Sequence, residues 1–295
     1  MGQSAPKPEN ETKNTNDDQK LAHVLLLGDS TIDNVAWVKG EGKSVCAHLR
    51  SMLGEDVKVT NYAADGFNTH HMLHGAMPSI SWSARIAEKD PFPLTHCDTF
   101  YPLKQAQGLQ GVTHIVLSVG GNDIREILGN MQLLSTRLEG FWKNYPAILD
   151  QCLKMTPRVC IMLQYRPCRK QRTYRVYEAM STLPGPQTGV EKLNGLMEKV
   201  YQPIFALARK HHLPLVDLTR SFDIDDASLY RSQIEPSAKG GARIAEILVH
   251  VLRTHSFGGG KSGGGGAMFY VKRKGSNSIE SEPCDEKGSW KIAED

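Results

Sequence analysis

Long hydrophobic runs are absent from this sequence of 295 residues. No apolar stretch approaches the roughly 20 residues that a transmembrane helix needs. The first twenty residues are polar and charged, unlike the apolar centre of a secretory signal peptide. A strong charge excess is missing too, because 35 Lys and Arg against 32 Asp and Glu leave a net charge of +3, whereas nucleic-acid-binding domains carry a concentrated basic surface. We therefore expect a cytoplasmic protein with no transmembrane segment and no nucleic-acid partner.

Closely spaced cysteines are absent as well. The chain has six cysteines, and no two of them have the spacing of a zinc site or a redox-active pair. We expect reduced thiols that pack as small hydrophobic side chains, with no metal site and no cofactor. With 40% hydrophobic residues, the chain is still long enough to bury a sizeable core.

Both ends of the chain lack the apolar residues that a folded core requires. Residues 1–20 are rich in Asn, Lys, Glu and Asp, and we expect a disordered N-terminal tail there. A glycine-rich run starts at Gly258, and we expect residues 258–295 to form a flexible linker and a disordered C-terminal tail. Residues 21–257 remain as one domain.

Within that domain, short runs of Val, Ile and Leu alternate with helical patterns. The runs predict five strands that are buried on both faces, at Ala22–Leu27, Val57–Tyr62, His114–Val119, Arg158–Leu163 and Leu213–Leu218. Apolar residues at helical spacing predict helices over Val45–Leu53, Val190–His211 and Ala238–Leu252. Because parallel strands need crossover connections, we expect an α/β fold of three layers with a five-stranded parallel sheet in the middle.

Polar clusters follow four of the predicted strands. They are Gly28-Asp29-Ser30-Thr31, Asn61-Tyr62-Ala63-Ala64-Asp65-Gly66, Gly120-Gly121-Asn122-Asp123 and Ile234-Glu235-Pro236-Ser237. Each cluster alone fits a helix cap or a turn glycine. Since binding residues in open parallel sheets gather outside the carboxyl ends of the strands, the four clusters together indicate one site.

The first three clusters resemble the diagnostic blocks of the SGNH/GDSL hydrolases, and the resemblance extends over residues 23–252. It implies a flavodoxin-like α/β/α sandwich that hydrolyses carboxylic esters or related acyl bonds and needs no cofactor. It makes Ser30 the nucleophile, and it assigns the oxyanion hole to the Ser30 and Gly66 backbone N–H groups and the Asn122 side-chain amide. We also expect a helix directly behind Ser30, whose N-terminus would favour the developing negative charge.

The last block departs from the family pattern, Asp-x-x-His-Pro. The matching stretch reads Ser232-Gln233-Ile234-Glu235-Pro236. Glu235 thus occupies the position of the histidine and Ser232 that of the aspartate, so the catalytic triad is incomplete.

Three hypotheses stay open about this departure. In the first, Glu235 is the general base, although a carboxylate is weaker than imidazole by roughly two pKa units, or about 3 kcal/mol, unless burial raises its pKa. In the second, a histidine from elsewhere replaces it. The candidates are His70, His71 and His74, and more remotely His250 and His255. In the third, the domain has lost hydrolysis and serves as a ligand-binding or protein-interaction module.

Two further segments lie near the expected site. Five basic residues crowd the loop after the fourth strand, namely Arg166, Arg169, Lys170, Arg172 and Arg175. They are either a solvated loop or a field that attracts an anionic ester substrate. The insertion at residues 78–109 carries Trp82, Phe92, Phe100 and Tyr101, which either cover the site or pack on the side of the domain. The expected partner is a small-molecule acyl ester; the oligomeric state is open.

Overall fold

The computed structural model describes residues 20–78, 85, 98–129, 131–257, 266–284 and 290–292. The predicted N-terminal tail, apart from Lys20, lies outside the described residues. So do the glycine-rich run at residues 258–265, and Trp82 and Phe92 of the insertion.

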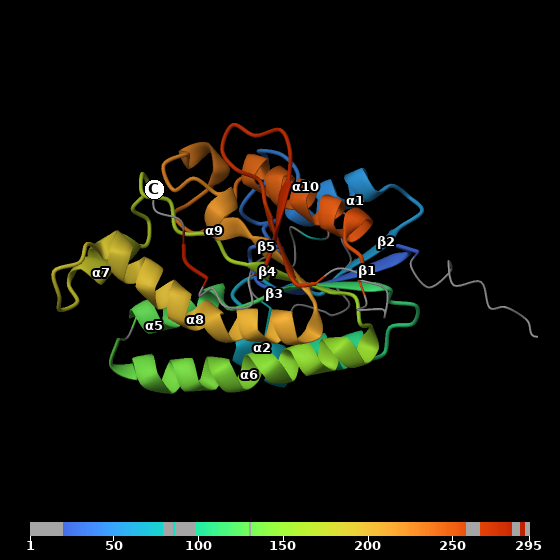
Figure 1. Ribbon diagram of the computed structural model, residues 1–295, viewed down its shortest axis with the longest axis horizontal. Helices are drawn as coiled ribbons and strands as arrows, with labels where there is room; N and C mark the ends of the chain where they lie inside the picture. The colour runs from blue at the N-terminus through green and yellow to red at the C-terminus, as the bar shows by residue number, and fades with distance from the viewer. Residues whose placement is uncertain are drawn as a thin grey trace, which may run out of the picture.

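A mostly parallel sheet forms the middle layer of the molecule (Figure 1). Its order is β2-β1-β3-β4-β5-β6-β7, with β7 alone antiparallel to its neighbour among these strands. The strands are β1 (His23–Gly28), β2 (Lys58–Asn61), β3 (His114–Ser118), β4 (Val159–Leu163), β5 (Pro214–Asp217), β6 (Met268–Val271) and β7 (Glu280–Pro283). The predicted α/β fold is confirmed, and the five predicted strands are β1 to β5 within two residues at each end.

Helices cover both faces of the sheet (Figure 1). Helices α1, α9 and α10 lie on one face, and α2, α5, α6 and α8 on the other. The helices are α1 (Val45–Leu53), α2 (Thr69–His74), α4 (Pro102–Ala106), α5 (Gly121–Gly129), α6 (Leu134–Met155), α7 (Val176–Ser181), α8 (Gly189–His211), α9 (Leu218–Ser221) and α10 (Ala238–Thr254). Helices α1, α8 and α10 match the predicted ranges within two residues.

Alternation along the strands divides the core into two halves. In β1, Leu25 and Leu27 point into the core under α6 and α8, whereas Val24 and Leu26 point into the core under α1 and α10. Side chains of successive strand residues lie on opposite faces, so an unbroken apolar run is what a doubly covered strand requires. Within the described ranges, no helix is both long enough and apolar enough to cross a bilayer.

The C-terminal segment extends the sheet. Strand β6 pairs with β5, and β7 pairs with β6, so the prediction of a disordered tail over residues 258–295 is wrong for these residues. The short apolar run that forms β6 finds an apolar neighbour in β5, and Phe269 packs edge-on against Phe205 of α8 at 5.4 Å between ring centres. Buried contacts of this kind offset the entropy cost of ordering a chain end.

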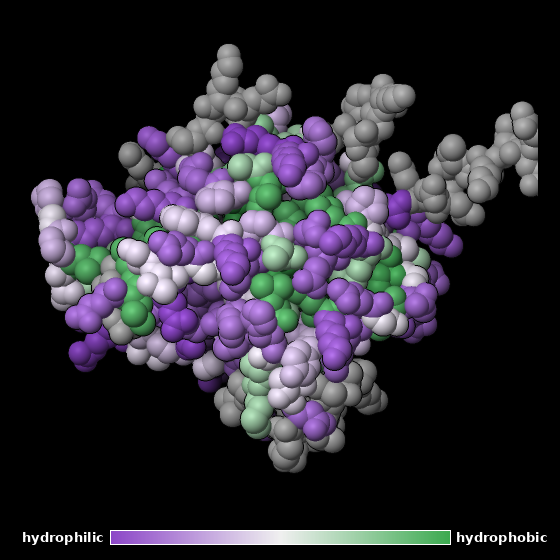
Figure 2. Space-filling view, turned by 90° about the horizontal axis from the view of Figure 1, so that it is seen from below, coloured by the Kyte–Doolittle hydropathy of each residue, from purple (hydrophilic) through white to green (hydrophobic). Residues whose placement is uncertain are grey.

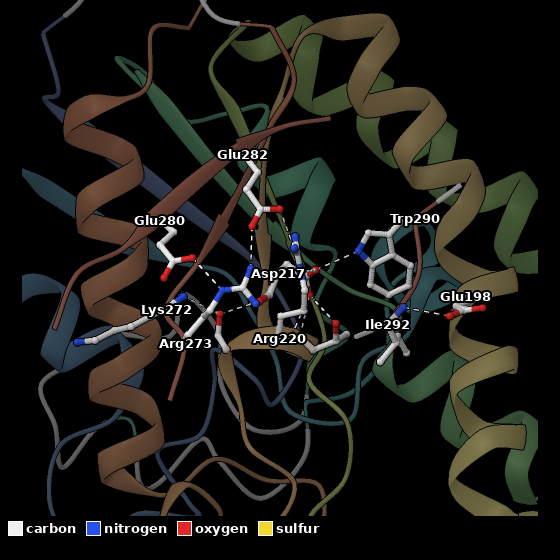
Figure 3. A network of polar contacts seen from close by, with 11 residues as sticks. Glu198, Asp217, Arg220, Lys272, Arg273, Glu280, Glu282, Trp290 and Ile292 are labelled. Carbon is white, nitrogen blue, oxygen red and sulfur yellow. Dashed lines mark hydrogen bonds and ion pairs between the residues drawn. The ribbon is translucent and has the colours of Figure 1, made fainter. Parts of the chain in front are cut away.

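A buried polar network fastens the same segment to the domain (Figure 3). Asp217, at the end of β5, accepts hydrogen bonds from Arg220 Nε at 2.7 Å and from the Trp290 indole at 3.0 Å. Arg220 in turn donates to Glu282 of β7 at 2.9 Å and lies over the Phe269 ring. Glu282 and Trp290 of the presumed tail therefore have partners more than 60 positions away in the chain, in Arg220 and Asp217.

The surface on the side of α6 has a mixed character. Figure 2 shows hydrophobic side chains there in separate areas between hydrophilic ones, an ordinary protein surface.

From the insertion, Phe100 is fully buried and packs edge-on against Tyr62 at 5.7 Å between ring centres. Tyr101 is exposed and lies beside Gly75. Phe100 thus belongs to the side of the domain, one of the two alternatives left open.

Cysteine thiols contribute to the interior. Four free thiols are buried and that of Cys284 is partly buried, while Cys97 lies outside the described residues. Across the described ranges, no three His, Cys, Asp or Glu side chains gather closely enough to hold a metal ion.

Candidate active site

Ser30 lies in a tight turn that directly follows β1. The amides of Ile32 and Asp33 donate to the Asp29 carbonyl at 3.1 and 2.9 Å, which closes a single turn. The predicted helix behind Ser30 is wrong, because the next helix, α1, starts only at Val45. Any stabilisation of negative charge at Ser30 therefore comes from individual N–H groups rather than from a helix dipole.

Gly28 is required at the start of this turn by close packing of two strands. A Cβ atom at this position would lie 2.1 Å from the Ser118 carbonyl oxygen of β3. The Asp29 amide donates to that same oxygen at 3.1 Å. A larger residue at position 28 would push β1 and β3 apart and displace the turn that carries Ser30.

The Asp29 carboxylate stabilises the turn that carries Ser30. It accepts a hydrogen bond from the Thr31 amide at 3.0 Å, and Gln164 Nε2 lies 3.2 Å from each of its oxygens. The Thr31 hydroxyl donates to the Gln164 carbonyl oxygen. Burial raises the pKa of Asp29 to about 7. The sequence interpretation missed Gln164, although it is the first residue after β4 and thus at the expected sheet edge.

The loop that carries Gly66 is tied to both neighbouring loops. Gly66 has a φ of +81°, in the left-handed region that favours glycine. Before it, the Asp65 amide donates to Asp33 of the Ser30 turn at 3.0 Å. After it, the Asn122 amide nitrogen donates to the Phe67 carbonyl at 2.9 Å. The loops of Ser30, Gly66 and Asn122 are thereby neighbours, as the sequence predicted from their strand ends.

Helix α5 anchors this loop a second time. The Asp123 carboxylate accepts hydrogen bonds from the Thr69 amide at 3.0 Å and from its hydroxyl at 2.6 Å. Glu126, one turn along α5, accepts from the Asn68 side chain at 2.6 Å. Burial raises the pKa of Asp123 to about 6. The acidic residue after Asn122 thus positions α2 against α5.

Glu235 is held rigidly just before α10. Its carbonyl accepts from the Arg231 amide at 2.8 Å, and Pro236 forms an antiparallel bridge with Tyr230. Asn34, four residues after Ser30, donates to the Pro236 carbonyl at 3.3 Å. Segments 200 positions apart in the sequence are joined in this way, and the Glu235 side chain is only 4% exposed.

One cavity brings three of the four predicted site residues together. Ser30, Asn122 and Glu235 all line it, and the space between its walls, counted together with the part that is open to solvent, is about 590 Å³. Gly66 is not among its lining residues, but its loop is bonded to both adjacent loops as described. The cavity has a polar end at these residues and an apolar end formed by α5, α7 and α8.

The electrostatics of Glu235 are unusual for a surface-adjacent carboxyl group. Burial raises its pKa well above the ordinary value, and the nearby charge of Asp65 raises it further. A hydrogen bond with the Ser30 side chain and the charge of Arg125 act in the opposite direction. A carboxylate with a raised pKa is a stronger proton acceptor once it is ionised.

Two residues near Glu235 were missed by sequence reasoning. Arg125 lines the cavity and lies three residues after Asn122 on α5, a helical spacing that places both on one side. Tyr174 is 36% exposed, and its pKa is raised by burial and by the charge of Glu235. No local pattern marks Tyr174, which lies among the basic residues of its loop.

None of the candidate histidines lines the cavity. The His71 ring packs on Phe67, at 5.5 Å between ring centres, and the rings of His70 and His74 lie against each other in a tilted arrangement at 4.5 Å. His255 follows α10, whose 17 residues carry it about 25 Å from Glu235. It hydrogen-bonds the Tyr270 hydroxyl at 3.0 Å, and burial lowers its pKa to about 4.

The basic residues after β4 also stay outside the cavity lining. Arg169 forms a two-pronged ion pair with Asp225, and Arg172 lies 3.6 Å from Glu178. For Arg169 and Arg172, these contacts favour the interpretation of a solvated loop with local ion pairs, whereas Arg166 is buried. Arg125 is the cation that borders the cavity among the described residues.

No protein-family model matches this sequence, and no curated protein matches it. Among solved structures, it is similar to the acetylxylan esterase Axe2 from Geobacillus stearothermophilus, with 14% identity, a TM-score of 0.44 and coverage of 79% of this chain and 95% of that one. It is also similar to a carbohydrate acetylesterase family member from Sinorhizobium meliloti, with 16% identity, a TM-score of 0.43 and coverage of 78% and 98%. At these identities, the site has to be judged on its own geometry.

Proposed function

We propose that this protein is a serine hydrolase of carboxylic esters in which Ser30 is the nucleophile and Glu235 the general base. The single observation that supports it most is the cavity that Ser30, Asn122 and Glu235 share, in which the Ser30 side chain lies close enough to the Glu235 carboxyl group to lower its pKa. A nucleophile in contact with a base, next to an amide donor, is the arrangement that acyl transfer requires.

The reaction would proceed in two halves. Ionised Glu235 takes the proton of the Ser30 hydroxyl. At the same time Ser30 Oγ attacks the ester carbonyl, and a tetrahedral oxyanion forms. Protonated Glu235 then gives this proton to the departing alcohol, and an acyl-enzyme remains. A water molecule, deprotonated by Glu235, attacks the acyl-enzyme; Glu235 then returns this proton to the departing Ser30 oxygen, and the acid is released.

Three N–H donors would stabilise the oxyanion: the backbone amides of Ser30 and Gly66 and the side-chain amide of Asn122. In the part of the chain that the structure describes, no hydrogen bond uses either backbone amide. The Asn122 side-chain amide donates one N–H to the Phe67 carbonyl. This hydrogen bond orients the amide and leaves its second N–H for a ligand. Fixed donors of this kind supply the largest share of catalysis in acyl transfer.

Burial offsets part of the weakness of a carboxylate base. Each pKa unit by which the protein raises Glu235 recovers about 1.4 kcal/mol of driving force for proton transfer. The raised pKa of Glu235 thus supports its role as the general base. It also means that the protein is active only at a pH high enough to ionise Glu235.

Labelling with a fluorophosphonate probe tests the proposal. We expect the probe to label the wild-type protein, and Ser30→Ala to lose both the label and at least about 10³-fold of the turnover of p-nitrophenyl esters. Ser44→Ala is the matched control, because Ser44 caps α1 and does not line the cavity, and it should keep the label. An unlabelled, inert wild-type protein would refute hydrolysis and favour a binding domain.

A further inference from the structure

Apolar side chains from four separate segments line part of the Ser30 cavity. They are Ile124 and Leu128 of α5, Val176 of α7, Leu193 and Met197 of α8, and Ile234 beside Glu235. Four of the six are at most 7% exposed, and all belong to or pack against the core on the α6 and α8 face. The cavity is therefore a recess in the core of the domain rather than a shallow surface groove.

Polar groups gather around Glu235. Arg125 and Asp65 act on the Glu235 charge, and Tyr174 responds to it, so all three lie close to that carboxyl group. Arg125 lines the cavity and is exposed, and Tyr174 is exposed as well, so the polar groups near Glu235 reach the solvent. In the proposed reaction Glu235 has to reach the oxygen of the departing alcohol, so the alcohol occupies this polar, open side.

The acyl group must then point away from Glu235, toward the apolar recess. We propose that the recess is an acyl-chain pocket and that the preferred substrate is an ester of a medium-length apolar acid rather than an acetate. This inference rests on the proposed function, because it takes Ser30 as the acylated residue. An acetyl group would leave most of the recess filled with water against apolar side chains, whereas a longer chain would cover them.

The expected size of the preference follows from the burial of methylene groups. Each buried CH₂ is worth about 0.8 kcal/mol, which corresponds to about a fourfold gain in kcat/KM. We expect kcat/KM to rise from p-nitrophenyl acetate through butyrate to hexanoate, and to stop rising when the chain outgrows the recess.

Two substitutions in α8 change the pocket in opposite directions. Leu193→Trp fills it, and we expect the ratio of hexanoate to acetate turnover to fall at least tenfold. Met197→Ala enlarges it, and the optimum should move to a longer chain such as octanoate. Ala206→Trp adds the same bulk to an exposed position of α8 and should leave the wild-type profile unchanged. Circular dichroism and thermal melting confirm that each variant is folded.

A second series assigns the pocket to the acyl or the alcohol side. Acetate esters of ethanol, butanol and hexanol, followed by pH-stat titration, lengthen only the alcohol. The proposal expects little gain along this series, and a gain here instead of in the acyl series would overturn it. A labelled, active protein that prefers acetate in both series would overturn the pocket while leaving the hydrolase intact. A protein with no label and no turnover would overturn the proposed function itself.

Discussion

Asp217 and Glu235 are two buried carboxyl groups near the same edge of the sheet, and their surroundings differ. Asp217 accepts hydrogen bonds from Thr219, Arg220 and Trp290, so both of its oxygens are occupied by the fold. Glu235 is also buried, but among the described residues its Oε2 atom has no hydrogen-bond partner. The Asp217 carboxylate is hydrogen-bonded at both oxygens and stabilises the fold, whereas Glu235 keeps one oxygen that can bind a ligand or accept a proton. Strained or unsatisfied groups of this kind concentrate at functional sites.

Glu235 and Glu282, the glutamate that pairs with Arg220, contribute to stability with opposite dependence on pH. The folded pKa of Glu235 is raised, so the native state holds its proton more tightly than the unfolded chain does. Its contribution to the free energy of unfolding is therefore greatest below about pH 4.5 and declines as the pH rises through the folded pKa. Glu282, beside Arg220, has a lowered pKa and contributes stability that is lost as the pH falls.

The largest expected effect comes from breaking the structural carboxylate. Asp217→Asn removes the buried charge that Arg220 Nε and the Trp290 indole both contact and leaves Arg220 with Glu282 as its carboxylate partner, and we expect a loss of about 3 kcal/mol in the free energy of unfolding. Urea or thermal denaturation measures it. Glu280→Gln, at an exposed ion pair with Arg273, is the control and should cost less than about 1 kcal/mol. Equal losses in the two variants would contradict the structural role of Asp217.

Glu235→Gln should lower turnover without lowering stability. The amide fits the same space but cannot accept the Ser30 proton, so kcat/KM should fall at least about tenfold. Because the substitution removes a poorly compensated buried carboxyl group, the free energy of unfolding at pH 8 should not fall. Glu139→Gln on the exposed side of α6 serves as the control for both measurements. Unchanged turnover in Glu235→Gln would remove the proposed base.

The pH profile sharpens the assignment. In the wild-type protein, kcat/KM should rise with pH through an apparent pKa well above the ordinary glutamate value, because only ionised Glu235 accepts a proton. The double variant Ser232→Asp with Glu235→His restores the usual family pair. Its turnover should increase, and its profile should follow an imidazole, with a midpoint near about 6.5. A profile that stays the same in the double variant would point to another titrating group.

The smallest effect is expected at His71, which supports the Gly66 loop without touching the cavity. Its ring nitrogen accepts from the Asn68 amide at 3.4 Å, and the ring also hydrogen-bonds the Gly66 backbone. His71→Ala should lower kcat by less than about tenfold and leave KM unchanged, because the loop would hold its oxyanion donor less firmly. His74→Ala, on the same helix, is the control. A change in KM alone would argue against this role.

Local patterns in the sequence predict the part of the fold that depends on local information. Apolar runs such as His114–Ser118 and the helical spacing in α10 each identify their own element, and the strand ends then place Ser30, Asn122 and Glu235 at one edge. The position of Gly66 in a left-handed turn follows from its residue type. Those inferences need no knowledge of distant partners.

The remaining features depend on contacts between distant residues. Strand β7 is made of Glu, Ser and Pro, a composition typical of a disordered tail, and it becomes ordered because Arg220 and Arg273 pair with its glutamates. The apolar recess could not be predicted, because Leu193 and Met197 have the same helical spacing as ordinary core residues. Only the packing of α5, α7 and α8 leaves a space beside them.

The position of β6 in the sheet has a consequence for synthesis on the ribosome. Strand β5 is completed at Asp217, but its open edge is covered only when Met268–Val271 have been translated. A nascent chain of about 250 residues therefore exposes the unpaired backbone N–H and C=O groups at the edge of β5, beside Leu215 and Val216, to other chains. During that interval, the growing polypeptide is open to misassembly and is a natural client for chaperones.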